Sequence, residues 1–537
     1  MDYQNLSSLN SSSPQYTRIS LEDPSVYNSA YFPPLLKDFG QTTPCKVLIC
    51  VTIYNEDSFE LQTTLKSICE NIENMQETNI EPQTVGVVLI QDGLEKLHRT
   101  MNEFGRSMGL FDPDFANEGD DNTLHCFASQ FQHPRNTEAF YPKFCVFTGI
   151  KHKNKGKLNS HKWFFKCIAQ HVNPKFCVLI DCGTIPEEKA IHWLVEAMQS
   201  RKNLGGVCGE IRAHEPKYCK LVIISQDIEY RVSHFMDKCM ESLFGFVTVL
   251  PGAFCAYRWK AINGEPLDEH YFYALEPEAE INCFKANMYL AEDRVLGAAL
   301  VFRRQKGYLL YYVEKSKAYT DVPTKFGQIM QQRRRWINGS WFALLHSFRL
   351  FLGIKDTSHN LLRKFLLALF MVYQVLFISV TYLTLAVSFI FLHFVVAVFS
   401  ENNEYFLEAG WILRGVYIGV LLALVLISII PKSGNVPLVF KTGAFFLIVL
   451  TIFALALSVV NVVQAETITY TVIALALAVF VCIISSAAVH GNFKPVMRGI
   501  LQYVVMLPCY VNVYLIYAFC NVQNVTWGLR NDKESNF

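Results

Sequence analysis

Five long apolar runs in the second half of the chain restrict its fold more than any other feature. They lie at residues 365–399, 412–430, 442–463, 468–489 and 499–520. A helix needs about 20 apolar residues to cross a bilayer, so these runs predict an α-helical transmembrane domain. The first run is longer than one span requires, and we expect its helix to begin outside the hydrocarbon region. Residues 337–363, which mix apolar and polar side chains, predict a helix at the membrane interface.

The last apolar run leaves two arrangements open. Arg498 and Arg530 flank it on both sides, and it contains Pro508. These features fit a helix that crosses the bilayer, and they equally fit a broken helix at the interface. We therefore predict a translocation domain of four or five hydrophobic helices over residues 364–520, followed by a tail over residues 521–537.

The connecting loops alternate in charge, which predicts an orientation. Among charged residues, the loops at 400–410 and 464–467 carry only Glu, whereas the loops at 431–441 and 490–498 carry only Lys and Arg. Loops rich in Lys and Arg stay in the cytosol. Residues 1–35 contain no apolar core of the kind a signal peptide needs. We therefore expect a multi-pass membrane protein whose first half is cytosolic.

Four short apolar runs predict a buried parallel sheet in the first half. They lie at residues 46–52, 85–90, 144–147 and 176–180 and alternate with helical patterns. Asp92 and Asp181 follow the ends of two of these runs, where parallel sheets bind their ligands. Nucleotide binding is therefore expected there, in an α/β domain over residues 45–336. Residues 1–44 are rich in Ser, Tyr and Pro and predict a flexible arm.

Composition excludes two other classes of site. The net charge is +1 and no basic stripe with interleaved aromatic residues is found, so we expect no nucleic-acid partner. The 16 cysteines form no C-x-x-C pair, and several lie in apolar stretches. That usage predicts reduced, buried thiols and neither a zinc site nor a disulfide framework.

Two acidic segments carry side chains suited to catalysis. Asp181 precedes Gly183, and a carboxylate at that place can hold Mg²⁺ or Mn²⁺ against a diphosphate, because hard cations prefer oxygen ligands. A helix cap or a turn at the strand end explains Asp181 equally well. The paired Glu292 and Asp293 suit a general base, although such pairs are also common on solvated surfaces.

A basic and aromatic segment at residues 331–336, with the sequence QQRRRW, is more specific. Guanidinium groups bind phosphate oxygens in a bidentate manner, and an indole offers a flat face to a sugar ring. The alternative is a basic collar that anchors the first membrane helix to lipid phosphates. The segment precedes that helix by about 30 residues, which is far for a collar.

Together these segments resemble the chitin synthases, within the processive inverting family 2 glycosyltransferases that have a GT-A domain. The resemblance extends from about Val51 to Gly528. The segments that carry it include KHKNKGKLNSHKWFF (151–165), GGVCGEIRA (205–213), QDIEYRVSH (226–234), VLPGAFCAYR (249–258), EDR (292–294), QQRRRWINGS (331–340) and NVTWG (524–528). It implies an α/β GT-A glycosyltransferase domain followed by an α-helical transmembrane domain.

The resemblance also implies roles for residues that bind the donor. Tyr54, Glu56 and Asp92 would hold the uridine, and Lys157 would lie near the nucleotide. Asp181 would coordinate the divalent metal, Mg²⁺ or Mn²⁺, on the diphosphate.

On the acceptor side, the resemblance implies that Asp293 is the catalytic base, with Glu292 beside it in the substrate site. Gln332, Arg335 and Trp336 match the family's Q-x-x-R-W motif, which holds the acceptor end and the donor diphosphate. Trp527, in the W-G motif of the tail, would lie close to the active site.

The implied activity is chitin synthesis. GlcNAc would pass from UDP-GlcNAc to the 4-hydroxyl of a growing β-1,4-linked chain, with inversion, and the polymer would be extruded across the bilayer. The expected partners are UDP-GlcNAc, the chitin chain, the lipid bilayer and a second copy in a homodimer, at the plasma membrane. The alternative is a hyaluronan or chito-oligosaccharide synthase, and a nucleotide-binding transporter or scaffold is less favoured.

Overall fold

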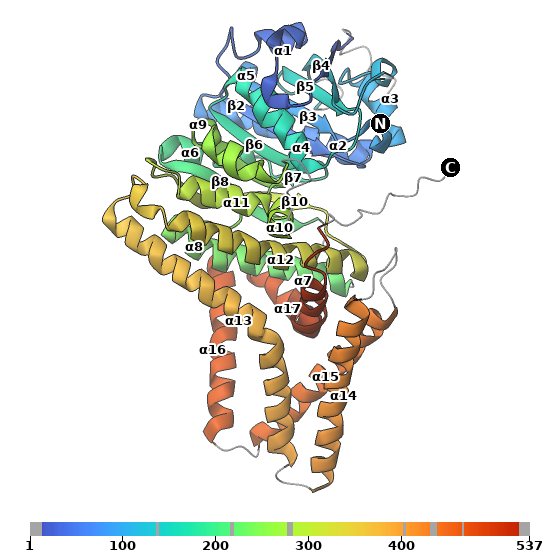
Figure 1. Ribbon diagram of the computed structural model, residues 1–537, viewed down its shortest axis with the longest axis vertical. Coiled ribbons are helices and arrows are strands. Elements are labelled where there is room, and N and C mark those ends of the chain that lie inside the picture. The colour runs from blue at the N-terminus through green and yellow to red at the C-terminus, as the bar shows by residue number, and fades with distance from the viewer. Residues whose placement is uncertain are drawn as a thin grey trace.

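The computed structural model describes residues 13–116, 118–135, 139–214, 220–275, 283–400, 404–429, 438–463 and 467–525. In this part of the chain an α/β domain lies above a set of long helices, and a layer formed by α7 (Leu221–Val232) and α12 (Phe326–Phe351) lies between them (Figure 1). The predicted order of an α/β domain followed by an α-helical domain is confirmed.

The α/β domain is built on one mixed sheet of ten strands. The order across the sheet is β1-β4-β5-β3-β2-β6-β9-β8-β10-β7. The strands are β1 (Gln15–Ser20), β2 (Val47–Ile53), β3 (Val85–Gln91), β4 (Thr123–Phe131), β5 (Phe144–Lys151), β6 (Phe176–Asp181), β7 (Ile185–Pro186), β8 (Leu204–Ala213), β9 (Phe254–Arg258) and β10 (Leu309–Thr320). The four predicted strands are β2, β3, β5 and β6, which pair in parallel at its centre. Antiparallel β4 and β9 extend this centre on its two sides.

Helices cover both faces of the sheet because its central strands are apolar on both sides. Alternate residues of β2 point to opposite faces. Val47 and Ile49 pack in the cluster that contains α2 and α6, whereas Leu48 and Cys50 pack in the cluster that contains α4 and α11. The helices of this domain are α1 (Pro34–Asp38), α2 (Ser58–Asn74), α3 (Arg99–Ser107), α4 (Lys157–Lys162), α5 (Gln170–Val172), α6 (Ala190–Ser200), α8 (Cys239–Phe244), α9 (Trp259–Ile262), α10 (Cys283–Tyr289) and α11 (Glu292–Val301).

The N-terminal segment is part of the domain, so the prediction of a flexible arm over residues 1–44 is wrong for residues 13–44. Strand β1 pairs with the edge strand β4 in an antiparallel register that runs from Gln15 opposite Ala128 to Ser20 opposite Thr123. Leu36 is fully buried in the core. The segment is polar in overall composition, and only a few of its side chains are apolar and pack into the core. The sequence therefore carries no clear signal of this packing. Residues 1–12 lie outside the described part of the chain.

Leu36→Ala tests this packing. The substitution removes a fully buried side chain, and such changes cost about 2–5 kcal/mol of unfolding free energy because a cavity remains. We expect a lower melting temperature for the purified protein in detergent. The matched control is Lys37→Ala, which changes an exposed neighbour on the same helix. Equal melting temperatures for the two variants would contradict the packing.

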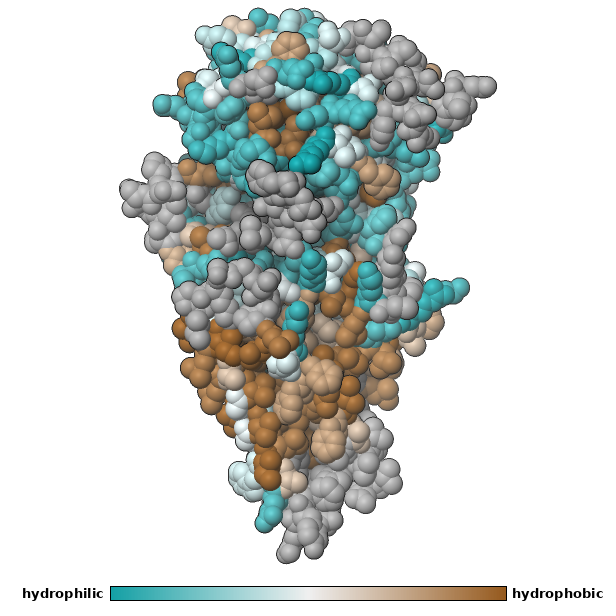
Figure 2. Space-filling view, turned by 90° about the vertical axis from the view of Figure 1, so that its right-hand side faces the viewer, coloured by the Kyte–Doolittle hydropathy of each residue, from teal (hydrophilic) through white to brown (hydrophobic). Residues whose placement is uncertain are grey.

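All five predicted apolar runs lie on helices. These are α13 (Leu361–Ser400), α14 (Glu404–Ile429), α15 (Leu438–Val463), α16 (Thr467–Val489), α17 (Phe493–Pro508) and α18 (Leu515–Cys520). Within the described residues, three helical stretches are long and apolar enough to cross a membrane: Leu361–Val395, Glu408–Ile429 and Phe493–Cys520. Hydrophobic side chains cover much of the surface of this half, whereas hydrophilic ones prevail over the α/β domain (Figure 2).

The last apolar run forms a continuous helical stretch with one irregular segment. A π-helical segment, Cys509–Tyr514, lies between α17 and α18 and begins directly after Pro508, as expected where proline removes a backbone donor. Gly499 lets α17 approach α7, since an added Cβ would lie 2.7 Å from Ile228. Half of the most apolar window of this stretch is buried, compared with 11% for Leu361–Val395. Other parts of the protein therefore cover much of the surface of Phe493–Cys520, whereas the surface of Leu361–Val395 is largely exposed.

The segments predicted to be catalytic and interfacial share one helix. The predicted boundary between residues 336 and 337 falls inside α12, which continues without a break from Phe326 to Phe351. The QQRRRW segment forms its first half and the amphipathic segment its second half. Side chains of the first half are therefore held at a constant position relative to those of the second half.

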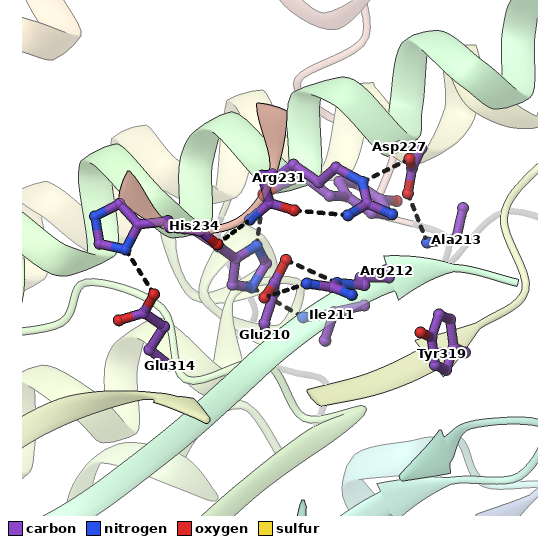
Figure 3. Close-up of polar contacts among 12 residues, drawn as sticks. Glu210, Ile211, Arg212, Ala213, Asp227, Arg231, His234, Glu314 and Tyr319 are labelled. Atoms are coloured by element: carbon purple, nitrogen blue, oxygen red, sulfur yellow. Dashed lines mark hydrogen bonds and ion pairs between the residues drawn. The ribbon is translucent and has the colours of Figure 1, made fainter. Parts of the chain in front are cut away.

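Polar contacts, some of them buried, join the α/β domain and α7 to the loop before α17 (Figure 3). Arg231 of α7 donates to Asp227 Oδ2 at 2.7 Å and to Asn492 Oδ1 at 2.7 Å. Asp227 also accepts a bond from the backbone N–H of Ala213 on β8. His490 lies 2.6 Å from Glu314 of β10. The loop at 490–492 thus lies on the same side of the helical domain as the sheet.

Candidate active site

Asp181 lies where three elements meet. It ends β6, and its backbone N–H donates to the carbonyl of Ala253 at 3.2 Å. The hydroxyl of Thr52, on neighbouring β2, donates to Asp181 Oδ1 at 2.8 Å. Lys157 Nζ, in the first turn of α4, lies 2.5 Å from the same oxygen. Gly183 has a φ of +85°, which lets the chain turn away directly after the strand.

The three residues predicted to hold uridine lie at the adjacent ends of β2 and β3. The backbone N–H of Asp92 donates to the carbonyl of Ile53 at 2.8 Å, which joins the two strand ends. Glu56 Oε2 accepts a bond from the Tyr54 backbone N–H at 2.6 Å. Gln91 donates to the Tyr54 carbonyl at 2.6 Å. The structure therefore brings Tyr54, Glu56 and Asp92 together.

Two lysines that the sequence analysis did not single out bind Asp92. Lys151 Nζ lies 2.6 Å from Asp92 Oδ1, and both side chains are buried. The backbone N–H of Lys155 donates to the same oxygen at 3.1 Å. Burial lowers the pKa of Lys151, although Asp92 opposes this effect. The basic stretch at 151–157 is the sequence signal that pointed to this region.

Glu292 and Asp293 form the first turn of α11. Asp293 Oδ1 accepts a bond from the Arg294 backbone N–H at 2.8 Å. Burial raises the pKa of both carboxyl groups. The Asp293 charge raises the pKa of Glu292 further, whereas the positive charge of Lys157 opposes the rise in both. A carboxylate with a raised pKa is a stronger base, as a proton acceptor requires.

The two acidic sites share one loop. An added Cβ at Gly252 would lie 3.4 Å from Lys157 Nζ and 3.9 Å from Glu292 Oε1. Burial lowers the pKa of Lys157, but Asp181, Glu292 and Asp293 outweigh that effect and raise it. The end of β6, the start of α4 and the start of α11 therefore converge around Gly252, although their residues lie far apart in sequence.

Helix α12 brings the Q-x-x-R-W residues to the same place. An added Cβ at Gly339 would lie 3.1 Å from the Cβ of Ala291, so α12 packs directly beside the start of α11. The charge of Arg335 reaches Glu292 and opposes the rise in its pKa. Gln332 and Trp336 extend the same face toward α7, where the ring of Trp336 lies 6.0 Å from that of Tyr230.

An ion pair beside Trp336 was also missed. Arg333 Nη2 lies 2.6 Å from Glu229 Oε2 on α7. The guanidinium of Arg333 lies 4.3 Å from the Trp336 ring centroid, a cation–π distance. Glu229 belongs to the QDIEYRVSH segment, which also contains Asp227 and Arg231, so its charge alone did not set it apart in the sequence.

A small cavity lies beneath the start of α11, between α12 and α13. Its polar lining comes from Thr248, Arg294, Ser340, Ser347 and Gln374. Arg294 directly follows Asp293 in the chain, so the cavity begins next to the acidic pair. It extends toward the first long apolar helix.

A further group of side chains could hold a metal ion. Among the described residues, Glu265, Glu269 and His270 form a cluster whose ligand atoms lie within 4.8 Å of one another, and Glu269 is exposed. Asp181 is not part of that cluster. Oxygen atoms of a carboxylate and of a bound diphosphate are nevertheless a donor set that suits Mg²⁺ or Mn²⁺, so Asp181 fits such an ion. Trp527 lies outside the described residues.

Comparison with known proteins shows the family to which this domain is similar. Residues 47–351 match the family model described as a chitin synthase-like glycosyltransferase domain. This range contains every predicted site residue except Trp527.

Individual relatives extend the match over most of the chain. Chitin synthase 1 of Phytophthora sojae is 31% identical over 90% of this chain and 56% of its own length. Chitin synthase C of Aspergillus oryzae is 31% identical over 96% of this chain and 61% of its own. Chitin synthase 1 of Saccharomyces cerevisiae is 31% identical over 90% of this chain and 46% of its own length. The chain thus spans about half to three fifths of the length of these relatives.

The chain also aligns with a solved structure. The mannosyltransferase PcManGT from Pyrobaculum calidifontis, in complex with GDP-Man and Mn2+, aligns over 93% of each chain with a TM-score of 0.35 and 10% identity. That likeness is too low to carry an argument about the fold or the site.

Proposed function

The chain belongs to the chitin synthase family of glycosyltransferases, and from this premise we propose that it transfers GlcNAc from UDP-GlcNAc to the 4-hydroxyl of a growing β-1,4-linked chain. One observation carries the proposal. Asp181, Lys157 and the Glu292–Asp293 pair converge around Gly252, in a domain that the layer of α7 and α12 joins to helices long enough to cross a membrane.

In this proposal the donor occupies the carboxyl ends of β2, β3 and β6. Tyr54, Glu56 and Asp92 hold the uridine. Lys157 and Asp181 lie at the diphosphate, where Asp181 would hold Mg²⁺ or Mn²⁺. Such an ion would supply positive charge against the diphosphate. The ammonium group of Lys157 adds a second positive charge beside it.

The reaction is a single displacement at the anomeric carbon. The acceptor 4-hydroxyl forms a bond to that carbon, the bond to the UDP oxygen breaks, and UDP leaves with the electron pair. Asp293 takes the hydroxyl proton. Attack from the side opposite UDP converts the α-linked donor into a β-linked product, so no covalent intermediate on the protein is needed. The charges of Lys157 and Arg335 lie near the acidic pair and favour its anionic form.

The acceptor end of the glycan would lie against Trp336 and Gln332. An indole offers an apolar face to a sugar ring, and an amide offers a donor and an acceptor to its hydroxyls. From here we propose that the product passes toward α13, past the small cavity that Arg294, Ser340 and Gln374 line between α12 and α13. Trp527 remains a proposed member of the site.

We place the α/β domain on the cytosolic side of the plasma membrane. The basic loop at 490–498 contacts β10 through His490 and α7 through Asn492, and loops rich in Lys and Arg are typically cytosolic. A homodimer is proposed from the family resemblance.

The test uses purified full-length protein in detergent with radiolabelled UDP-GlcNAc. We expect an insoluble labelled polymer that chitinase degrades and whose formation needs Mg²⁺ or Mn²⁺. Short soluble products would point to a chito-oligosaccharide synthase, and a requirement for UDP-glucuronate to a hyaluronan synthase. Nucleotide binding without any sugar transfer would leave only the transporter or scaffold.

A further inference from the structure

Glu241, in the first turn of α8, makes two hydrogen bonds to a single residue of the loop that follows this helix. Its Oε1 accepts a bond from the Thr248 hydroxyl at 2.6 Å, and its Oε2 accepts one from the Thr248 backbone N–H at 3.0 Å. Gly245 ends α8 with a φ of +75°, which turns the chain back so that Thr248 faces Glu241. Both oxygens of the carboxylate therefore hold the start of this loop.

The same loop leads into the proposed active site. Thr248 is followed by Leu250, which is fully buried, and by Gly252, which faces Lys157 and Glu292. Ala253 ends the loop and accepts the backbone bond from Asp181. The position of the loop at one end thus depends on Glu241 and at the other end on β6.

The charges around Glu241 also connect it to the acidic pair. Burial raises its pKa to about 7, although the two bonds from Thr248 and the charge of Lys238 oppose the rise. The charge of Lys238 also acts on Asp293, and Glu241 acts on Arg294. A buried carboxylate is costly unless its bonds are satisfied. The mechanism proposed above gives this carboxylate no role.

We infer that Glu241 is a positioning residue that holds the Thr248–Ala253 loop in place between the donor diphosphate and the catalytic base. The inference rests on the proposed function of the site. Glu241 contacts Thr248, so its effect on the reaction would pass through the loop.

The experiment is a double-mutant cycle of Glu241→Gln and Thr248→Val. Glu241→Gln replaces one acceptor oxygen with an amide NH₂, and Thr248→Val removes the hydroxyl but keeps the backbone N–H. We expect Glu241→Gln to lower kcat about tenfold, because bonds to a charged group are worth more than neutral ones. The KM for UDP-GlcNAc should change less than about twofold, since the uridine residues are untouched. The double variant should be no slower than Glu241→Gln.

A second readout does not depend on sugar transfer. Hydrogen exchange of peptides that cover residues 245–255 should become faster in both single variants, because each variant weakens the pair of bonds that anchors Thr248 to Glu241. The conservative variant Thr248→Ser keeps both donors and should restore wild-type values. If wild-type protein forms no polymer, the proposed function fails, while exchange still tests the anchor.

Asp237→Asn is the matched control. It removes another carboxylate charge near Lys238, one turn before Glu241, and Asp237 bonds to Ser233 instead of the loop. We expect wild-type kcat and exchange for this variant. Three results would overturn the inference: independent, multiplicative losses in the cycle, unchanged exchange at 245–255, or an equal loss in Asp237→Asn. If Glu241→Gln does not fold, kcat and hydrogen exchange of Thr248→Val and Thr248→Ser test the inference. Equal values for these two variants would then overturn it.

Discussion

Asp293→Asn is expected to lower the rate of sugar transfer by about a thousandfold, within the 10²–10⁴ range that a positioned general base contributes. The amide keeps the size of the carboxyl group but cannot take the proton of the attacking hydroxyl. Binding of UDP should persist, because Tyr54, Glu56 and Asp92 are unchanged. Radiolabel incorporation measures the rate, and the rise in melting temperature on adding UDP measures binding.

Two comparisons sharpen this prediction. Asp268→Asn removes a surface carboxylate that pairs with Lys166, and it should leave the rate unchanged. Glu292→Gln tests the neighbouring acid, and we expect a smaller loss than for Asp293→Asn. A greater loss in Glu292→Gln would transfer the role of base to Glu292, and wild-type rates in both would refute the mechanism.

Asp181→Asn should reduce kcat/KM by about 10²–10³-fold, since a metal ion on the diphosphate supplies several kcal/mol of charge stabilisation. The variant would also leave Lys157 without the carboxylate that lies 2.5 Å away. Binding of UDP should lose its dependence on Mn²⁺, which isothermal titration with and without the ion measures directly.

The matched variant is Thr52→Val, which removes the hydroxyl that donates to Asp181 Oδ1 but keeps the carboxylate. A single hydrogen bond to a charged group is worth about 1.5–3 kcal/mol, so we expect a loss of about tenfold and an intact response to Mn²⁺. Retention of the Mn²⁺ response in Asp181→Asn would remove Asp181 from the proposed metal site.

The elements that the sequence predicted are those with a local signal. The runs that became β2, β3 and β6 are apolar along their whole length, which identifies strands buried on both faces. The five long apolar runs became helices because length and apolarity are properties of the segment itself. The β1 strand carried no such signal, since it depends on the edge of β4, about 100 residues away.

The residues of the candidate site also fall into those with a local sequence signal and those without one. Sequence alone pointed to Asp92 and Asp181, at the ends of predicted strands, as nucleotide-binding residues and to the Glu292–Asp293 pair as a candidate base, because such features are readable in one segment. Their partners were not readable. The structure shows that Lys151 contacts Asp92 and that Lys157 contacts Asp181. It also shows that Thr248 contacts Glu241, an acid that the sequence analysis did not single out.

The sequence by itself thus determined the order of the two domains, the central strands, the apolar helices and the acids, because each depends on neighbouring residues. Only the tertiary structure decided that the end of β6, the start of α11 and the loop through Gly252 meet at one place. Such convergence depends on the order of strands in the sheet and on the packing of α12 beside α11. Neither is encoded in any single segment, because both arise from the burial of surfaces far apart along the chain.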